Sequence, residues 1–194
     1  GKPKGAMLSH LNVIHSMMHF QYCMPLRDGV RSILAVPASH VTGLIANIAS
    51  VIGCAGTSII MSQFKAADYL KLAAEEKIEY SILVPAMYKL CLMDDHFDQL
   101  DLSHWRVGGY GGAPMPVSTI DELASRLPGL QLMNAYGATE TCSPTTIMPA
   151  VHTRAHADSV GFVLPCAEVR VVNDRGEVLP AGESGELWIR GPMV

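Results

Sequence analysis

Residues 31–61 read RSILAVPASHVTGLIANIASVIGCAGTSIIM. The segment 31–39 is short, apolar and rich in strand-forming residues, which predicts a buried strand. Residues 42–53 follow with the length and composition of a helix, and 56–61 form a second strand-like segment. A strand, a helix and a second strand in this order predict two parallel strands joined by a crossover helix.

The same alternation continues on both sides of this unit. Toward the N-terminus, Ser9 is placed to cap a helix over 10–23, after a short apolar segment at 5–9. Toward the C-terminus, the pattern predicts helices at 65–77, 86–95 and 117–127, and strands at 80–85, 105–111 and 130–137. The sequence therefore predicts an α/β domain, a layered parallel sheet with flanking helices.

The character of the sequence changes after about residue 158. Residues 167–191, AEVRVVNDRGEVLPAGESGELWIRG, alternate with a period of two around the turn-forming NDRG at 173–176. No helical pattern occurs there. We expect an antiparallel hairpin that starts a small second β subdomain.

Composition limits the classes of function. Of the 194 residues, 49% are hydrophobic and 16% are charged, and the formal net charge is −4. A globular domain is expected, and without a basic stripe nucleic acid is not the expected partner. No apolar run reaches the roughly 20 residues of a transmembrane helix. The five cysteines are widely spaced, which predicts buried free thiols in a reducing, cytoplasmic compartment.

Three glycine-bearing loops carry candidate chemistry. The first, Gly1–Gly5, includes Lys4, and backbone N–H groups with a lysine ammonium can hold phosphate oxygens. The second, GGYGGAP at 108–114, follows a predicted strand and lets a flat ligand approach the backbone. The third is NAYGATE at 134–140. Tyr136 offers a stacking face, Thr139 a hydroxyl for a phosphate, and Glu140 a carboxylate for Mg²⁺.

Five motifs in this chain resemble those of the adenylate-forming superfamily, which contains acyl-CoA synthetases, aryl-CoA ligases, beetle luciferase and adenylation domains. They are GKPKG at 1–5, VPASHVTG at 36–43, GGAP at 111–114, NAYGATE at 134–140 and GELWIRGPMV at 185–194. They follow the order of the family across essentially the whole chain.

This resemblance implies an ATP-dependent acid–thiol ligase. It would join a fatty or aryl carboxylic acid to AMP and then transfer the acyl group to coenzyme A. ATP, Mg²⁺ and coenzyme A are the implied cofactors. The residues it assigns to catalysis are Lys4, His40, Thr139 and Glu140, with Glu140 as the Mg²⁺ ligand. The residues it assigns to the nucleotide are Gly1, Gly5, Gly111, Gly112, Ala113, Pro114, Asn134, Ala135, Tyr136, Gly137 and Thr139. The residues it assigns to the acid are His40, Val41, Gly109 and Tyr110.

The resemblance also predicts a domain organisation. Residues 1–157 are expected to form an α/β nucleotide- and acyl-binding subdomain that lacks its N-terminal part. Residues 158–194 are expected to begin a β-barrel-like subdomain. A mobile C-terminal lid domain would follow in the family, so this chain resembles an excerpt that is inactive alone.

Two alternatives to a coenzyme A ligase stay open. At SQFKA, Gln63 stands where several coenzyme A ligases carry a basic residue, and Lys65 replaces an acid. The acyl acceptor can therefore be a carrier protein, loaded with an amino acid or another acyl group. VPASH has no acidic residue for a substrate amine, which favours an acyl or aryl substrate. The second alternative is a nucleotide-binding module without catalytic activity.

Overall fold

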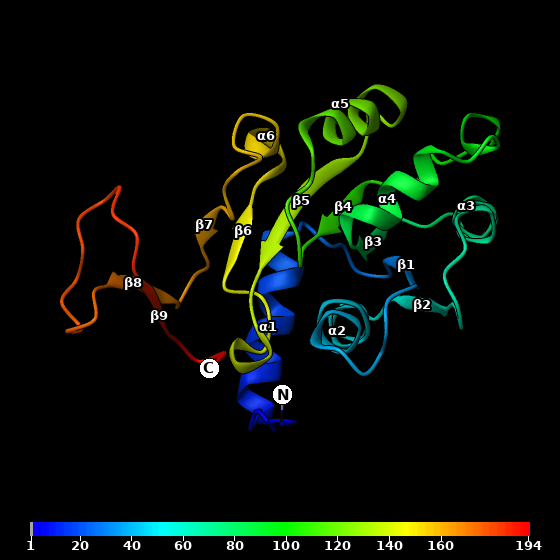
Figure 1. The fold of residues 1–194 in the computed structure, drawn as a ribbon. Coiled ribbons are helices and arrows are strands. Elements are labelled where there is room, and N and C mark those ends of the chain that lie inside the picture. Colours follow the sequence, from blue (N-terminus) through cyan, green and yellow to red (C-terminus); the bar gives the residue numbers. More distant parts are fainter. Residues whose placement is uncertain (1) are drawn as a thin grey trace.

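The computed structural model describes residues 2–194 and contains a seven-stranded sheet in the order β2-β1-β3-β4-β5-β6-β7 (Figure 1). The strands are β1 (Arg31–Leu34), β2 (Thr57–Ile60), β3 (Tyr80–Leu83), β4 (Val107–Tyr110), β5 (Gln131–Tyr136), β6 (Thr146–Met148) and β7 (Phe162–Val163). The pairs among β1 to β5 are all parallel, which confirms the α/β fold predicted from the sequence.

Helices cover both faces of this sheet (Figure 1). They are α1 (His10–Cys23), the π-helix η1 (Thr42–Ala49), α2 (Ser50–Gly53), α3 (Ala66–Glu75), α4 (Pro85–Leu92), α5 (Val117–Arg126) and α6 (Ala150–Thr153); two short 3₁₀ turns are η2 (Phe97–Gln99) and η3 (Thr139–Thr141). Residues of α3, α4 and α5 share one apolar core, and residues of α1 and η1 share the other.

Strand β3 shows how a short buried strand supplies both cores. Tyr80 and Ile82 point into the core beneath α1 and η1, whereas Leu83 belongs to the core beneath α3 and α4. Ser81 points the same way as Leu83, and its hydroxyl lies 2.5 Å from that of Tyr69 on α3. The alternation follows from the period of two in a strand, and it explains why all four residues are buried.

The start of α1 agrees with the capping pattern in the sequence. The Ser9 hydroxyl accepts from the Asn12 backbone N–H at 3.2 Å, and the Asn12 side chain accepts from the Ser9 N–H at 2.7 Å. This reciprocal capping box satisfies two N–H groups that the first turn leaves free. The preceding residues 5–8 form no strand, and Met7 is 97% exposed.

Two parts of the sheet were not predicted. The sequence pattern ends the strand series at 130–137, but β6 and β7 extend the sheet as antiparallel strands. They have three and two residues, too short for a clear period-two pattern.

The predicted helix 42–53 is also present, but its first eight residues have π rather than α geometry.

The last segment forms a separate two-stranded antiparallel sheet of β8 (Glu168–Val172) and β9 (Glu186–Arg190). The predicted NDRG turn is present, since the Gly176 N–H donates to the Asn173 carbonyl oxygen at 2.9 Å. Pairing after this turn ends at Pro180, which has no N–H to donate, so β8 takes its main partner from β9. The expected antiparallel pairing is confirmed, with a longer connection than a simple hairpin.

The cysteine prediction is correct in part. All five cysteines are free thiols. Cys54, Cys91 and Cys142 are buried and Cys23 is partly buried, but Cys166 is exposed, so the expectation that all are buried is wrong for that residue. Cys166 lies in the link to β8, outside both cores. None of the helices in residues 2–194 combines the length and the apolar character needed to cross a bilayer.

Candidate functional site

A cavity of about 340 Å³ lies at the carboxyl ends of β4 and β5. Three segments form its walls: residues 112–114 after β4, residues 134–137 at the end of β5, and residues 157–160 before β7. The carboxyl edge of a parallel sheet is the usual ligand-binding edge of such folds. Seven residues assigned to the nucleotide line this cavity: Gly112, Ala113, Pro114, Asn134, Ala135, Tyr136 and Gly137.

The glycines after β4 allow two walls of the cavity to approach each other. A Cβ atom at Gly111 would lie 2.4 Å from the carbonyl oxygen of Ala135, closer than a real contact permits. Gly112 has a φ of +78°, in the left-handed region that glycine adopts without steric cost. The backbones of β4 and β5 are therefore held together at their ends by residues without side chains.

No motif in the sequence indicated the third wall, residues 157–160. The Asn134 side-chain amide donates to the Ser159 carbonyl oxygen at 3.2 Å, and the Thr146 hydroxyl donates to the Val160 carbonyl oxygen at 2.6 Å. Both bonds tie this segment to β5 and β6. Asp158 is exposed in this wall and adds a carboxylate to the cavity.

The loop after β5 contains residues that anchor it to the domain and residues that face solvent. The Thr145 N–H donates to the Tyr136 carbonyl oxygen at 2.7 Å, and the Thr141 hydroxyl bonds to both backbone groups of Ala138. Thr141 is buried, whereas Thr139 and Glu140 are exposed on η3. Tyr136, which is 36% exposed, is one of the residues that line the cavity.

The donor set of the loop fits Mg²⁺ bound together with phosphates. Within residues 2–194, no group of three His, Cys, Asp or Glu side chains is placed to hold a metal ion. A protein cage for a metal is therefore absent from the described part of the chain. Mg²⁺ typically binds one or two carboxylates and completes its coordination with phosphate oxygens and water. A single exposed carboxylate at Glu140, beside the Thr139 hydroxyl, matches this mode.

The N-terminal lysine–glycine motif has no regular structure. Lys4 and Gly5 are exposed in the segment that leads into α1, and Gly1 lies outside the described residues. The loop after β5 packs against α1, because Cys142 and Phe20 belong to the same core. Figure 1 shows the N-terminus at the same end of α1 as this loop.

The residues assigned to the acid do not line the cavity. Val41 lies in the core beneath α1, and Tyr110 lies in the opposite core, where burial raises the pKa of its hydroxyl. Gly109 is buried in β4, and its carbonyl oxygen accepts from the Tyr88 hydroxyl at 2.9 Å. His40 is exposed, and its Nδ1 accepts from the Thr42 backbone N–H at 3.2 Å.

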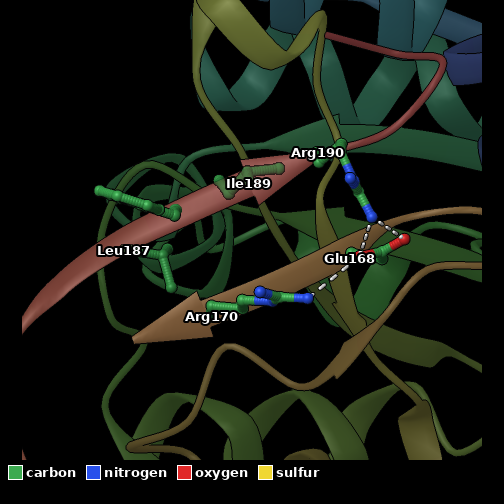
Figure 2. Close-up of a pocket in the computed structure, with 6 residues that line it drawn as sticks. Glu168, Arg170, Leu187, Ile189 and Arg190 are labelled. Atoms are coloured by element: carbon green, nitrogen blue, oxygen red, sulfur yellow. Dashed lines mark hydrogen bonds and ion pairs between the residues drawn. The ribbon is translucent and has the colours of Figure 1, made fainter. Parts of the chain in front are cut away.

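A second cavity, of about 500 Å³, lies against the β8–β9 sheet and is shown in Figure 2. Arg190 forms an ion pair with Glu168 at 2.6 Å, and Arg170 lies 4.0 Å from the same carboxylate. Leu187, Trp188 and Ile189 complete the lining. Its residues come only from β8 and β9, so it is separate from the cavity at the sheet edge.

Comparisons with known proteins agree with this architecture. The sequence model of the AMP-binding enzymes matches residues 1–194. The feruloyl-CoA synthase of an Amycolatopsis species is 29% identical over 194 residues, which cover 100% of this chain and 39% of that protein.

Two solved structures have the same fold. The N-terminal domain of FACL13 from Mycobacterium tuberculosis has a TM-score of 0.91 at 28% identity, covering 99% of this chain and 48% of that chain. The o-succinylbenzoate-CoA synthetase MenE of Bacillus subtilis, in complex with AMP, has a TM-score of 0.88 at 26% identity, covering 100% of this chain and 39% of that chain. The chain thus spans about two fifths of the length of the curated relatives it matches.

Proposed function

Because this chain belongs to the AMP-binding enzyme family, whose model matches residues 1–194, we propose that it forms the nucleotide-binding part of an AMP-forming acid–thiol ligase. The observation that carries this proposal is the cavity at the ends of β4 and β5. Residues from two separate sequence motifs and from one unpredicted segment line it together. Its volume of about 340 Å³ lies at the lower end of the range for small-molecule sites.

In this proposal the cavity takes the adenosine part of ATP. The Tyr136 ring stacks on the base, because an aromatic face that is partly exposed at a cavity gains most by covering a flat ligand. The backbone of Gly112–Pro114 and that of Asn134–Gly137 form two sides of this cavity. Because Gly111 has no Cβ atom, its backbone can lie directly against the Ala135 carbonyl oxygen, and this contact sets the spacing of the two sides.

The phosphates then extend along the loop after β5. The Thr139 hydroxyl donates to the α-phosphate, and the Lys4 ammonium, with the backbone N–H groups of Gly1–Gly5, neutralises charge on the phosphates. Bound Mg²⁺ would supply further neutralisation of that charge, with Glu140 as its protein ligand. Positioning and charge neutralisation are the main contributions of a protein to such substitutions.

The reaction has two steps. A carboxylate oxygen of the acid attacks the α-phosphorus of ATP, the bond to the β-phosphate oxygen breaks, and pyrophosphate leaves. His40 orients the acid and does not need to accept a proton, because a carboxylic acid is already ionised at neutral pH. The sulfur of a thiol then attacks the acyl carbonyl carbon of the acyl-adenylate and forms a thioester. The carbon–oxygen bond to AMP breaks, AMP leaves with that electron pair, and the thiol proton is released.

Coenzyme A is the proposed thiol, because similar proteins such as the feruloyl-CoA synthase are named for a coenzyme A product. The proposed acid is fatty or aryl, and the proposed compartment is the cytoplasm. A carrier protein as acceptor, and a module that binds nucleotide without catalysis, are the outcomes that the experiment has to distinguish from this function.

The test is carboxylate-dependent exchange between ATP and pyrophosphate, measured on the intact protein that carries this sequence. The acids are short, medium and long fatty acids, benzoate- and cinnamate-type acids, and amino acids. We expect exchange with one fatty or aryl class, its loss in Glu140→Ala, and its retention in Glu183→Ala, which removes an exposed carboxylate from the β8–β9 segment.

AMP binding, measured by calorimetry on the same variants, separates the alternatives. AMP binding that Tyr136→Ala weakens, without exchange for any acid, would replace the ligase with a non-catalytic module. Exchange followed by acyl transfer to a carrier protein but not to coenzyme A would correct the acceptor.

A further inference from the structure

The helix that follows His40 has an unusual geometry. Thr42–Ala49 is a π-helix of eight residues, and it continues directly into α2. π-Helices occur mostly as single-turn bulges inside α-helices, frequently at functional sites, and their wider turn is less favourable than an α-turn. The sequence TGLIANIA has nothing that prefers this geometry, so contacts from outside the helix have to maintain it.

Asn47 makes the most extensive of these contacts. Its side chain is fully buried, and its Nδ2 donates to the Ser32 hydroxyl at 2.8 Å and to the Ile33 carbonyl oxygen at 3.0 Å, both on β1. Its Oδ1 accepts from the Ser58 hydroxyl on β2 at 3.0 Å. Both donor hydrogens of the amide are therefore used, and the amide connects the helix to two strands.

Two hydroxyl groups bind carbonyl oxygens of the same turn. The Tyr80 hydroxyl, on β3, donates to the Ala46 carbonyl oxygen at 2.6 Å. The Ser50 hydroxyl donates to the Ile45 carbonyl oxygen at 2.8 Å, and the Ser50 backbone N–H also donates to that oxygen. The bond between residues 45 and 50 has the five-residue spacing of a π-helix. Buried donors thus satisfy the carbonyl groups that a π-turn positions differently from an α-turn.

The first turn of this helix is connected to His40. The Thr42 N–H and the Thr42 hydroxyl lie 3.2 and 3.0 Å from His40 Nδ1. A Cβ atom at Gly43 would lie 2.3 Å from the Pro37 carbonyl oxygen, so the chain before the helix packs directly on its first turn. Any change in the register of η1 therefore moves the imidazole of His40.

We propose that Asn47 is a positioning residue for the carboxylic acid substrate: it holds the π register of Thr42–Ala49 and thereby sets the place of His40. This inference rests on the proposed function, in which His40 orients the acid. A change of one residue in register rotates the preceding residues by about 100° and shifts them by about 1.5 Å along the axis. Such a change would also remove Val41 from the core in which it is now buried.

The test compares three variants of the intact protein. Asn47→Leu removes all three amide hydrogen bonds at similar volume. Ser58→Ala removes only the hydrogen bond to Asn47 Oδ1, and it is the variant to measure if Asn47→Leu does not fold. Tyr69→Phe is the matched control, because it removes a buried hydroxyl contact to Ser81 on the opposite face of the sheet.

A displacement of about 1 Å at a reacting group can lower a rate about a hundredfold. We expect Asn47→Leu to lower kcat/KM for the acid in pyrophosphate exchange by about that factor. We expect a smaller loss in the same direction for Ser58→Ala. The Kd for AMP should stay at the wild-type value, because the nucleotide cavity is built from β4, β5 and 157–160. Hydrogen exchange of the 41–50 amides should be faster in both variants and unchanged in Tyr69→Phe.

Several results would overturn the inference. An unchanged kcat/KM for the acid in a folded Asn47→Leu protein would reject it and leave the proposed ligase intact. Equal losses of acid and AMP affinity would also reject it, because they would show a general loss of stability. An unchanged KM in His40→Ala would remove its premise, and a wild-type protein without exchange for any acid would refute the ligase and this inference together.

Discussion

Replacing Gly111 by alanine tests the spacing of the two nucleotide-site walls directly. The new Cβ would lie 2.4 Å from the Ala135 carbonyl oxygen, and an ordinary contact begins at 3.4 Å, so the backbones have to separate by about 1 Å (3.4 − 2.4). The neighbouring pair Tyr110–Asn134 belongs to the β4–β5 ladder. Since adjacent strands lie about 4.8 Å apart, a displacement of this size weakens the last ladder bonds.

The loss of stability in Gly111→Ala follows from these contacts. Overpacking of a tight site costs about 1–3 kcal/mol. For a domain of this length, about 1 kcal/mol corresponds to a change in Tm of about 2–4 °C, so we expect a fall of about 2–12 °C. The same displacement shifts Ala135 against Gly112–Pro114 across the cavity, and AMP affinity should fall with it.

The chain offers a matched control at Gly129. A Cβ atom there meets nothing within 4 Å, and the residue is not among those with a positive φ. Gly129→Ala should leave AMP affinity unchanged and Tm unchanged or slightly raised, because alanine restricts the unfolded chain. Calorimetry gives both quantities for the two variants. Equal Tm values for Gly111→Ala and Gly129→Ala would refute the steric argument, and a lower Tm with unchanged AMP affinity would refute the assignment of this cavity to the nucleotide.

Two further predictions concern pH. Burial lowers the pKa of His19. Its Nε2 donates to the Pro165 carbonyl oxygen at 2.9 Å, and its buried Nδ1 has no hydrogen-bond partner among residues 2–194. In the unfolded chain this imidazole has a pKa of about 6.5, so the unfolded state takes up the proton first and the free energy of unfolding decreases as pH falls below that value. In urea unfolding measured from pH 5 to 7, His19→Gln should reduce this dependence of the free energy of unfolding on pH. The Arg27 guanidinium, bonded to Glu79 at 2.5 Å, lowers the pKa of that carboxyl, so the pair stabilises the fold above about pH 4.3 and loses this effect as pH falls through the lower folded value. Glu79→Gln should lower the urea midpoint at pH 7 but not near pH 2, and an equal effect at both values would contradict the ion-pair explanation.

The sequence predicted those parts of the fold in which a local structural requirement, such as burial, close backbone approach or helix capping, selects one type of residue. Apolar runs predicted β1 to β5. In β1, β3 and β4 these residues are buried almost throughout, because strands covered on both faces need apolar side chains, whereas β2 lies at the sheet edge and is partly exposed. Glycines predicted a loop after β4, and the structure has a local reason for glycine there, because a Cβ atom at Gly111 would collide with the Ala135 carbonyl oxygen. Ser9 predicted the start of α1 through its capping hydroxyl.

The parts that the sequence did not predict depend on backbone groups or on distant partners. The wall at 157–160 is held by two carbonyl oxygens, those of Ser159 and Val160, and every residue type has such an oxygen. The π geometry of η1 depends on Asn47 meeting Ser32 and Ser58, which are 15 and 11 residues away in the chain. No local pattern distinguishes it from an α-helix.

The loop after β5 depends both on local residues and on distant packing, and its geometry holds the exposed residues that we propose for the phosphates and Mg²⁺. Cys142 and Ser143 have φ values of 51° and 36°, in a region that residues other than glycine seldom adopt. Such a conformation persists only where surrounding structure imposes it. Cys142 is fully buried in the core beneath α1, and Thr141 is bonded to Ala138 on its other side. The packing of Thr141 and Cys142 therefore fixes the direction in which Thr139 and Glu140 leave the loop.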